Sequence, residues 1–250
     1  MGPADYSCLC MRTAPTGGAA IDVALTVAEF LDGSPFPSVT VRAYRDNVVT
    51  WGTCSTPTCA EGMTSALGEV HVGGLLNGWM ATHVLAEPGP TPATTAVDTI
   101  RYNLLAAGGP VEAQVVSVST INLIPTVLGF RREAGSEVLI ATVIDCAGRP
   151  VQGAHLQVVT SAGVAIPEGM LGRETHYKYF DGTSFPSATQ PYTHVDGMAM
   201  VANLRAGPGL ATVEVWGRLP GGGGPSLVAA EHVMLMPDTV TIVDATPLRR

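Results

Sequence analysis

The segment DCAGRPVQGAHLQVV (Asp145–Val159) has the pattern that decides the fold: an apolar stretch ends, a Gly-x-Pro turn follows, and an alternating segment begins. A second segment, FLDGSPFPSVTVRAY (Phe30–Tyr44), repeats this order about one domain length earlier. Side chains of a β-strand alternate between its two faces, so an alternating segment after a sharp turn indicates a strand with one face in a core. The two segments therefore predict two β-structures of the same kind in one chain.

Matching segments occur in the same order in both halves of the chain. The pairs are Gly33–Pro35 with Gly148–Pro150, Thr64–Gly78 with Thr193–Gly207, and Ile121–Val127 with Val233–Thr239. Because the spacing between partners is nearly constant, we predict one β-sandwich written twice, with the extra residues of each copy in loops. The predicted organisation is an N-terminal extension at 1–19, a first sandwich at 20–127, a linker at 128–135, a second sandwich at 136–244 and a C-terminal tail at 245–250.

Strand and turn signals dominate over helix signals. Ile21–Phe30 and Ser136–Asp145 are rich in β-branched residues and end at Gly/Pro turns. The chain contains 29 Gly and 19 Pro, which suits many turns and few long helices. The best helix candidate is Thr99–Ala107, with one or two turns. We predict an all-β protein of two tandem immunoglobulin-like or prealbumin-like β-sandwiches.

The charge balance argues against a nucleic-acid partner. The formal net charge is −8, and the densest cationic pairs are Arg131-Arg132 and Arg249-Arg250. A protein that neutralises several phosphates needs clustered Lys and Arg, so we predict no nucleic-acid binding. Charges, Gly or Pro interrupt every apolar run before it reaches the length of a membrane span, so no transmembrane segment is predicted.

The five cysteines predict at least one disulfide. Cys54 and Cys59 enclose a short polar loop, and a bridge there would contribute roughly 2 kcal/mol. Free thiols, or half of a zinc site, remain alternatives, although no second Cys or His pair follows at ligand spacing. Either Cys8 or Cys10 can pair with Cys146, which leaves one odd thiol.

The N-terminus leaves two interpretations of the cellular location open. MGPADYSCLC has neither a basic n-region nor an apolar h-region, so the chain is either cytosolic or lacks an export signal that has been removed. Cysteines in exposed loops and the all-β pattern favour export. We therefore expect an extracellular, periplasmic or cell-surface protein, with a lipid anchor upstream of the first residue left open.

Two segments of the second copy carry a family resemblance. ATVIDCAGRPVQGAHLQVVTSAG (Ala141–Gly163) and THVDGMAMVANLRAGPGLATVEVWG (Thr193–Gly217) resemble the bacterial immunoglobulin-like modules of invasin and intimin type. They are nearly as similar to carboxypeptidase regulatory-like, or transthyretin-like, modules. The resemblance extends over Ser136–Val243 and, more loosely, over Ala20–Val127. It implies a β-sandwich fold and transfers no functional residue, because such sandwiches serve as stalks, adhesins and accessory domains.

One long insertion is the candidate site. Ile166–Gly197 places five aromatic residues within sixteen positions of a polar loop, and aromatic rings with polar tips suit contact with a glycan or a protein. The candidate ligand-binding residues are His176, Tyr177, Lys178, Tyr179, Phe180, Asp181, Tyr192 and His194. The favoured interpretation, nevertheless, is that the loop packs on its own sandwich as a small additional core.

Catalytic chemistry has little support in the sequence. A metal site could use His176, Asp181, His194 and Asp196, but their spacing matches no known pattern. Nucleophile elbows and phosphate-binding loops are absent from the sequence. We predict no catalytic residue, no metal and no cofactor.

The sequence supports three functional hypotheses. The first is a non-catalytic secreted or surface-attached structural or binding protein, with a protein or glycan partner and an undetermined oligomeric state. The second is a glycan- or small-ligand-binding accessory module. The third is a metal-dependent enzyme of unrecognised type.

Overall fold

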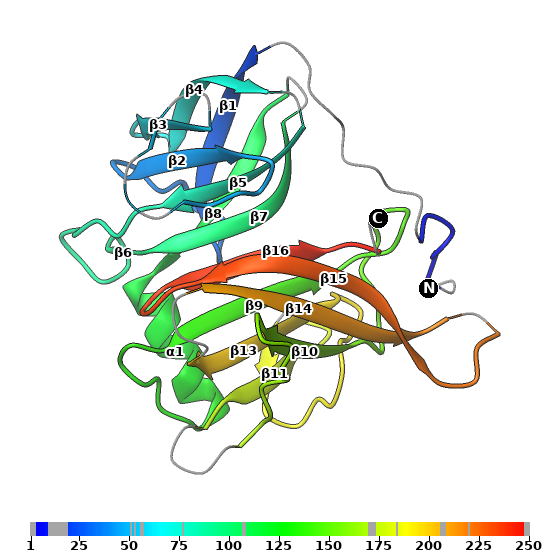
Figure 1. The fold of residues 1–250 in the computed structure, drawn as a ribbon. Helices are drawn as coiled ribbons and strands as arrows, with labels where there is room; N and C mark the ends of the chain where they lie inside the picture. Colours follow the sequence, from blue (N-terminus) through cyan, green and yellow to red (C-terminus); the bar gives the residue numbers. More distant parts are fainter. Residues whose placement is uncertain are drawn as a thin grey trace. The chain divides into compact units, whose positions relative to one another are not determined.

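The computed structural model describes residues 4–9, 20–50, 52, 54–55, 58–76, 78–106, 109–169, 174–183, 185–205, 209–219 and 221–247. The chain divides into two compact units. The first unit is Ala14–Leu123, and the second unit combines Met1–Thr13 with Ile124–Arg250. Strands are the main regular structure of both units, so the protein is all-β as predicted (Figure 1). The residue boundaries proposed from the sequence stay a prediction.

The first unit contains two four-stranded sheets. Its strands are β1 (Ala20–Glu29), β2 (Thr40–Arg45), β3 (Cys59–Met63), β4 (Glu69–Leu76), β5 (Gly78–Val84), β6 (Ala96–Val97), β7 (Thr99–Ala106) and β8 (Val111–Ser117). The sheets have the orders β4-β1-β8-β6 and β7-β5-β2-β3. Apolar side chains from both sheets form one core, among them Leu25, Val41, Val72 and Met80. Burial of these alternate side chains holds the two sheets together.

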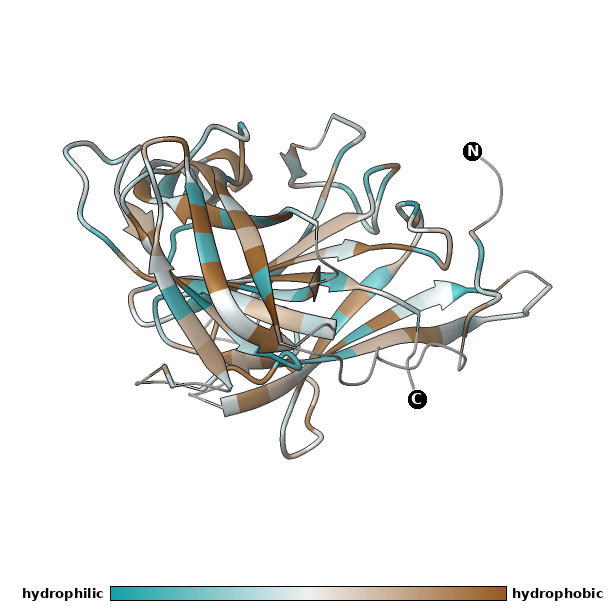
Figure 2. Cartoon of the chain, turned by 90° about the horizontal axis from the view of Figure 1, so that it is seen from above, coloured by the Kyte–Doolittle hydropathy of each residue, from teal (hydrophilic) through white to brown (hydrophobic). Residues whose placement is uncertain are grey.

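The second unit also contains two sheets, one of five strands and one of three. Its strands are β9 (Glu137–Val143), β10 (His155–Thr160), β11 (His176–Phe180), β12 (Pro186–Ser187), β13 (Met198–Leu204), β14 (Gly209–Arg218), β15 (Pro225–Leu235) and β16 (Val240–Ala245). They form the orders β12-β11-β13-β9-β16 and β10-β14-β15. Hydrophobic and hydrophilic residues alternate along several strands of the chain (Figure 2).

Six strands of each unit occupy equivalent positions. The order β4-β1-β8 in the first unit matches β13-β9-β16 in the second, and β2-β5-β7 matches β10-β14-β15. In both units the first strand pairs in parallel with the last: β1 with β8, and β9 with β16. The common order explains why similar segments recur in the sequence at nearly constant spacing.

A glycine in the left-handed region closes the same turn in each unit. The N–H of Val27 donates to the carbonyl of Gly68 at 2.8 Å, and the N–H of Val143 donates to that of Gly197 at 2.8 Å. The φ angles of these glycines are 74° and 68°. A Cβ on Gly197 would lie 2.5 Å from the carbonyl oxygen of Val143. Only glycine fits this approach, which accounts for the Thr-x-x-x-Gly sequence that both units share at Thr64–Gly68 and Thr193–Gly197.

The threonine of that pattern is buried and joins two turns. Thr193 Oγ1 donates to the carbonyl of Val151 at 2.7 Å and accepts the N–H of Ala154 at 2.9 Å. Thr64 makes the same two bonds in the first unit, each at 3.0 Å. These hydrogen bonds fix the entry to the second strand of each sandwich.

The third pair of matching segments was wrong. Ile121–Val127 lies in a helix, α1 (Val118–Leu128), whereas Val233–Thr239 covers the end of β15 and the turn after it. Pro125 inside the helix conceals it in the sequence, because proline lacks the N–H of a helical hydrogen bond.

Local caps hold α1 despite its proline. Ser117 Oγ accepts the N–H of Thr120 at 3.2 Å, which is the hydrogen bond of an N-cap residue. At the other end, Gly129 has φ 75° and the N–H of Phe130 donates to the carbonyl of Pro125 at 3.1 Å. This is the Schellman ending of a helix. With 11 residues, α1 is short, and no helix among the described residues is long and apolar enough to cross a membrane.

The helix predicted at Thr99–Ala107 was also wrong, because the segment forms strand β7. Its pairing with β5 contains one extra residue on the β7 side: Met80 pairs with Leu104, but Thr82 pairs with Arg101. Asn103 takes up the extra residue with φ 64°. Such a bulge breaks the two-residue alternation and gives a spacing that resembles a helix.

Two disulfides lie within the described residues. One joins Cys54 to Cys59, with Cα atoms 5.1 Å apart. The other joins Cys8 to Cys146 across 138 positions, with Cα atoms 5.5 Å apart. The described part of the N-terminal extension is therefore attached to the second unit. Cys10, the alternative partner of Cys146, lies outside the described residues.

Candidate functional site

The candidate insertion contains a strand instead of a free loop. Strand β11 pairs with β13 on one side and with the short β12 on the other. Successive side chains of a strand point to opposite faces, so the residues proposed as one binding surface are divided between two faces.

The tyrosines of β11 support the neighbouring strand β10. Tyr179 is buried, and its hydroxyl accepts the N–H of Leu156 at 3.2 Å. Tyr177 is half-buried; its hydroxyl accepts the N–H of Val158 at 3.2 Å and donates to the carbonyl of Ile166 at 2.7 Å. Burial raises the pKa of Tyr177 to about 12. These two tyrosines satisfy backbone groups and present no hydroxyl to a ligand.

His176 and Lys178 point the other way. The His176 ring stacks on Phe130, with ring centroids 4.3 Å apart, and burial lowers the pKa of His176. Lys178 Nζ lies 3.5 Å from Glu168 Oε1. Phe180, at the end of the strand, is fully buried. The three other candidate residues on β11 therefore lie on the opposite face of the strand from Tyr177 and Tyr179.

The remaining candidates lie in the turns after β11 and β12. Asp181 accepts hydrogen bonds from the hydroxyl and the N–H of Thr183, and these bonds lower the pKa of Asp181. His194 packs on Gly182, where a Cβ would lie 2.8 Å from the ring. Tyr192 is 40% exposed, and its ring lies edge-on to that of His155 on β10. Across the described chain, no group of three or more His, Cys, Asp or Glu side chains is arranged to hold a metal ion.

One hollow of the second unit is lined mainly by charged side chains. This arginine hollow has a volume of about 740 Å³ and is lined by Gly129, Phe130, Arg131, Arg132, Glu133, Ala134, Glu174, His176, Asn203 and Arg205. Arg205 pairs with Glu133 at 2.6 Å, and Arg132 lies 3.4 Å from Asp238. Most of its positive charge is therefore matched inside the protein.

A second hollow is lined by aromatic and polar side chains. This aromatic groove has a volume of about 480 Å³ and is lined by Gln152, Gly153, His155, Tyr192, Trp216, Gly217, Arg218 and Pro225. Trp216 and Tyr192 are 37% and 40% exposed. Two such rings at one opening offer an amphipathic surface that remains exposed to solvent in the folded unit.

Of the residues that line this groove, Tyr192 was among the candidates proposed from the sequence, whereas Trp216 and Arg218 were not. The signal was present in ATVEVWG (Ala211–Gly217), because Val213 and Val215 face the core and Trp216 must therefore face outward.

The buried carboxylates are engaged in structure. Glu137 accepts hydrogen bonds from the Thr241 hydroxyl at 2.7 Å and from the N–H of Met236 at 2.8 Å, and burial raises its pKa well above the usual value. Asp145 accepts from Arg149 Nη2 at 2.8 Å and from the N–H of Asp5 at 2.9 Å. Burial acts to raise the pKa of Asp145, but its hydrogen bonds outweigh burial and lower the pKa to about 2.

Glu29 has the same kind of role in the first unit. Its Oε1 accepts from the Thr120 hydroxyl at 2.6 Å and the Ser117 hydroxyl at 3.0 Å, so it joins the end of β1 to the start of α1. Buried carboxylates bound by turns and caps are typical of structural hydrogen-bond networks.

Comparison with known proteins gives no family. No protein-family model and no curated protein matches the chain. The invasin-type and transthyretin-like resemblances therefore stay predictions.

Solved structures similar to this chain include Gram-positive pilins. The shaft pilin SpaA from Lactobacillus rhamnosus GG is 15% identical, with a TM-score of 0.26 over 92% of this chain and 98% of the pilin. GBS52, the minor pilin of Streptococcus agalactiae, is 10% identical, with a TM-score of 0.26 over 91% of this chain and 96% of that one. The Bacillus anthracis TIE protein is 11% identical, with a TM-score of 0.27 over 91% of this chain, which spans 33% of that protein. With TM-scores this low, these similarities carry no argument about function.

Proposed function

We propose that this chain is a non-catalytic structural and binding protein that works outside the cell or on its surface, built from β-sandwich modules at 20–127 and 136–244. The observation that carries the proposal is the Cys8–Cys146 disulfide, which joins positions separated by 138 in the sequence. Disulfides persist in oxidising compartments and are rare in the cytosol. The Cys54–Cys59 disulfide is a second crosslink of the same kind.

The use of the ionisable side chains also supports a structural role. Groups with strongly shifted pKa values often mark catalytic sites, but structural networks shift pKa values as well. Here the carboxylates of Glu137 and Asp145 bind backbone N–H groups and neighbouring side chains of their own turns and strands. Their role in the fold accounts for their pKa shifts.

The experiment combines surface exposure with thiol trapping. In cells that encode the full chain, a maleimide of known mass is added to intact cells and then to lysed cells, and protease accessibility is measured in parallel. We expect the protein in the culture medium or protease-accessible on intact cells, with Cys8 and Cys146 unreactive until a reductant is added. Cys146→Ser is the matched control, because it frees Cys8 for labelling. A protease-protected cytoplasmic pool with reactive Cys8 would overturn the proposal.

A further inference from the structure

The aromatic groove brings three rings to one opening. His155 on β10 and Trp216 on β14 are registered partners across the ladder, so their side chains stand next to each other on one sheet face. The ring of Tyr192 lies at 79° to that of His155, with centroids 6.2 Å apart. Trp216 and Tyr192 thus form two walls, with His155 between them.

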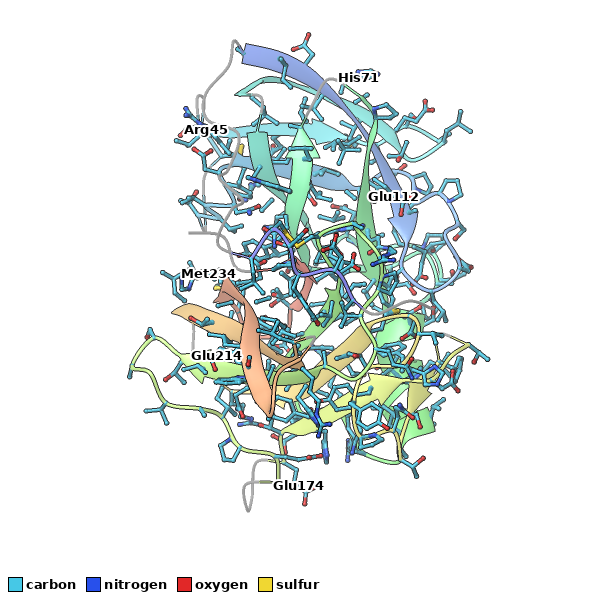
Figure 3. The ribbon with its side chains drawn as sticks, turned by 90° about the vertical axis from the view of Figure 1, so that its right-hand side faces the viewer. Arg45, His71, Glu112, Glu174, Glu214 and Met234 are labelled. Carbon is cyan, nitrogen blue, oxygen red and sulfur yellow. A yellow bond between two sulfur atoms is a disulfide. The ribbon has the colours of Figure 1, made fainter. Side chains whose placement is uncertain are left out.

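The fold holds both exposed rings in place. Tyr192 precedes Thr193, which is fully buried and bonded to the turn at 151–154 through its hydroxyl and its backbone. Trp216 Nε1 donates to Glu214 Oε2 at 3.1 Å, and this hydrogen bond orients the indole. The position of Glu214 is labelled in Figure 3. The pairing of β14 with β15 shifts register between Val215 and Trp216. Rings fixed in this way lose little conformational entropy when a ligand binds.

Polar side chains complete the lining. Gln152 supplies an amide that both donates and accepts hydrogen bonds, and His155 supplies an imidazole. Arg218 is exposed and makes no ion pair with any described residue, in a chain whose net charge is −8. A cation without an ion-pair partner in the described part of the chain, beside two exposed rings, suits a ligand that has both an apolar face and acidic or hydroxyl groups.

We infer that the aromatic groove binds a pyranose ring of an oligosaccharide. The apolar C–H face of the sugar stacks on Trp216 or Tyr192, its hydroxyls bond to Gln152 and His155, and Arg218 favours acidic sugars. The volume of about 480 Å³ falls within the roughly 300–1,000 Å³ of small-ligand sites. This inference deepens the proposed function, because it names the class of partner that the surface protein would bind.

Binding is tested with the full-length protein and defined probes. Isothermal titration and intrinsic fluorescence are measured with neutral chitotetraose and cellotetraose, and with acidic 3′-sialyllactose and a hyaluronan tetrasaccharide. We expect saturable binding of at least one probe and a change in tryptophan emission on saturation. If no probe binds at millimolar concentration, or if binding occurs without the groove residues, the inference is overturned.

Variants locate the binding. Trp216→Ala and Tyr192→Ala should each weaken binding at least tenfold, whereas Trp216→Tyr keeps a ring and should stay within a few-fold of the wild type. Arg218→Ala should weaken acidic probes more than neutral ones. Phe185→Ala is the matched control: Phe185 is also 40% exposed but does not line the groove, so its binding should be unchanged. Unchanged affinity in both Trp216→Ala and Tyr192→Ala would refute the site.

These outcomes separate the inference from the proposed function. Thermal melts of each variant verify that the exposed substitutions leave the fold intact. The saccharide titrations use purified protein and do not depend on where the cell places it. If no sugar binds, the surface location is still tested by the thiol-trapping experiment. If the protein is cytoplasmic, sugar binding by the groove is still tested by the titrations.

Discussion

Tyr179 tests directly whether the tyrosines of β11 stabilise the sandwich or contact a ligand. Its side chain is 6% exposed, and its hydroxyl accepts the N–H of Leu156 at 3.2 Å. Tyr179→Phe removes the oxygen and leaves a buried N–H unpaired, which costs about 1–3 kcal/mol. Tyr179→Ala also removes the ring and leaves a cavity, and we expect a loss of about 3–5 kcal/mol.

Urea unfolding followed by circular dichroism measures both losses. With a slope of roughly 2 kcal/mol/M, a loss of 2 kcal/mol lowers the midpoint by about 1 M. Tyr192→Phe is the matched control, because Tyr192 is 40% exposed and its hydroxyl has no hydrogen-bond partner among the described residues. This control should stay within about 0.5 kcal/mol of the wild type. A Tyr179→Phe midpoint equal to that of the wild type would show that the hydroxyl does not support β10.

Three further predictions concern the turns and crosslinks. The folded-state pKa of Asp145, about 2, lies below the unfolded value of 3.8, so its stabilisation is present above pH 4 and lost as the pH falls toward 2. Asp145→Asn should accordingly cost about 1–2 kcal/mol at pH 7, reduced by the solvent exposure of Arg149, and the difference from wild type should shrink in urea titrations at lower pH. Gly197→Ala should lower the melting temperature far more than Gly148→Ala, because a Cβ meets the Val143 carbonyl oxygen at the first position and open space at the second; equal losses would contradict the close approach. Cys54→Ser combined with Cys59→Ser should destabilise the first unit by roughly 2 kcal/mol in chemical denaturation, and an unchanged midpoint would show that the bridge does not stabilise it.

The recurrence of the turns was the part of the fold that could be predicted from the sequence. The segments that begin at Thr64 and Thr193 were matched because the bonds of each turn join residues close together in the chain, although the role of the two threonine hydroxyls appears only in the structure. The alternating strands after each Gly-x-Pro turn were identified for the same reason.

Features that depend on the partner strand could not be predicted. The bulge at Asn103 is defined by the strand opposite β7, and without that strand the spacing of Ile100 and Leu104 resembles a helix. In α1, the caps at Ser117 and Gly129 outweigh the cost of Pro125, and the sequence alone did not show which would prevail.

The candidate site itself stays a prediction. The density of aromatic residues drew attention to Ile166–Gly197, but composition does not say which face of β11 each ring occupies. Tyr179 and Phe180 are buried in the core, whereas Tyr192 lines a groove together with Trp216. Trp216 lies 24 positions later in the chain, outside the aromatic-rich insertion.

The Cys8–Cys146 disulfide also decides how mechanical tension crosses the molecule. If the chain is pulled before Cys8 and after Ala245, force enters the second unit at Cys146 and bypasses the whole first unit. Val143, just before Cys146, is registered with Ala245, so β9 and β16 are pulled from the same end and their hydrogen bonds break one after another.

Reduction reverses this geometry. The load then reaches the N-terminal ends of β1 and β9, and each parallel pair is pulled from opposite ends, so that its hydrogen bonds resist together. The released loop of 138 positions adds on the order of 450 Å of extendable chain. Single-molecule pulling with and without reductant should therefore record a longer extension and a higher rupture force after reduction, so that one thiol exchange sets both the reach and the strength of the protein.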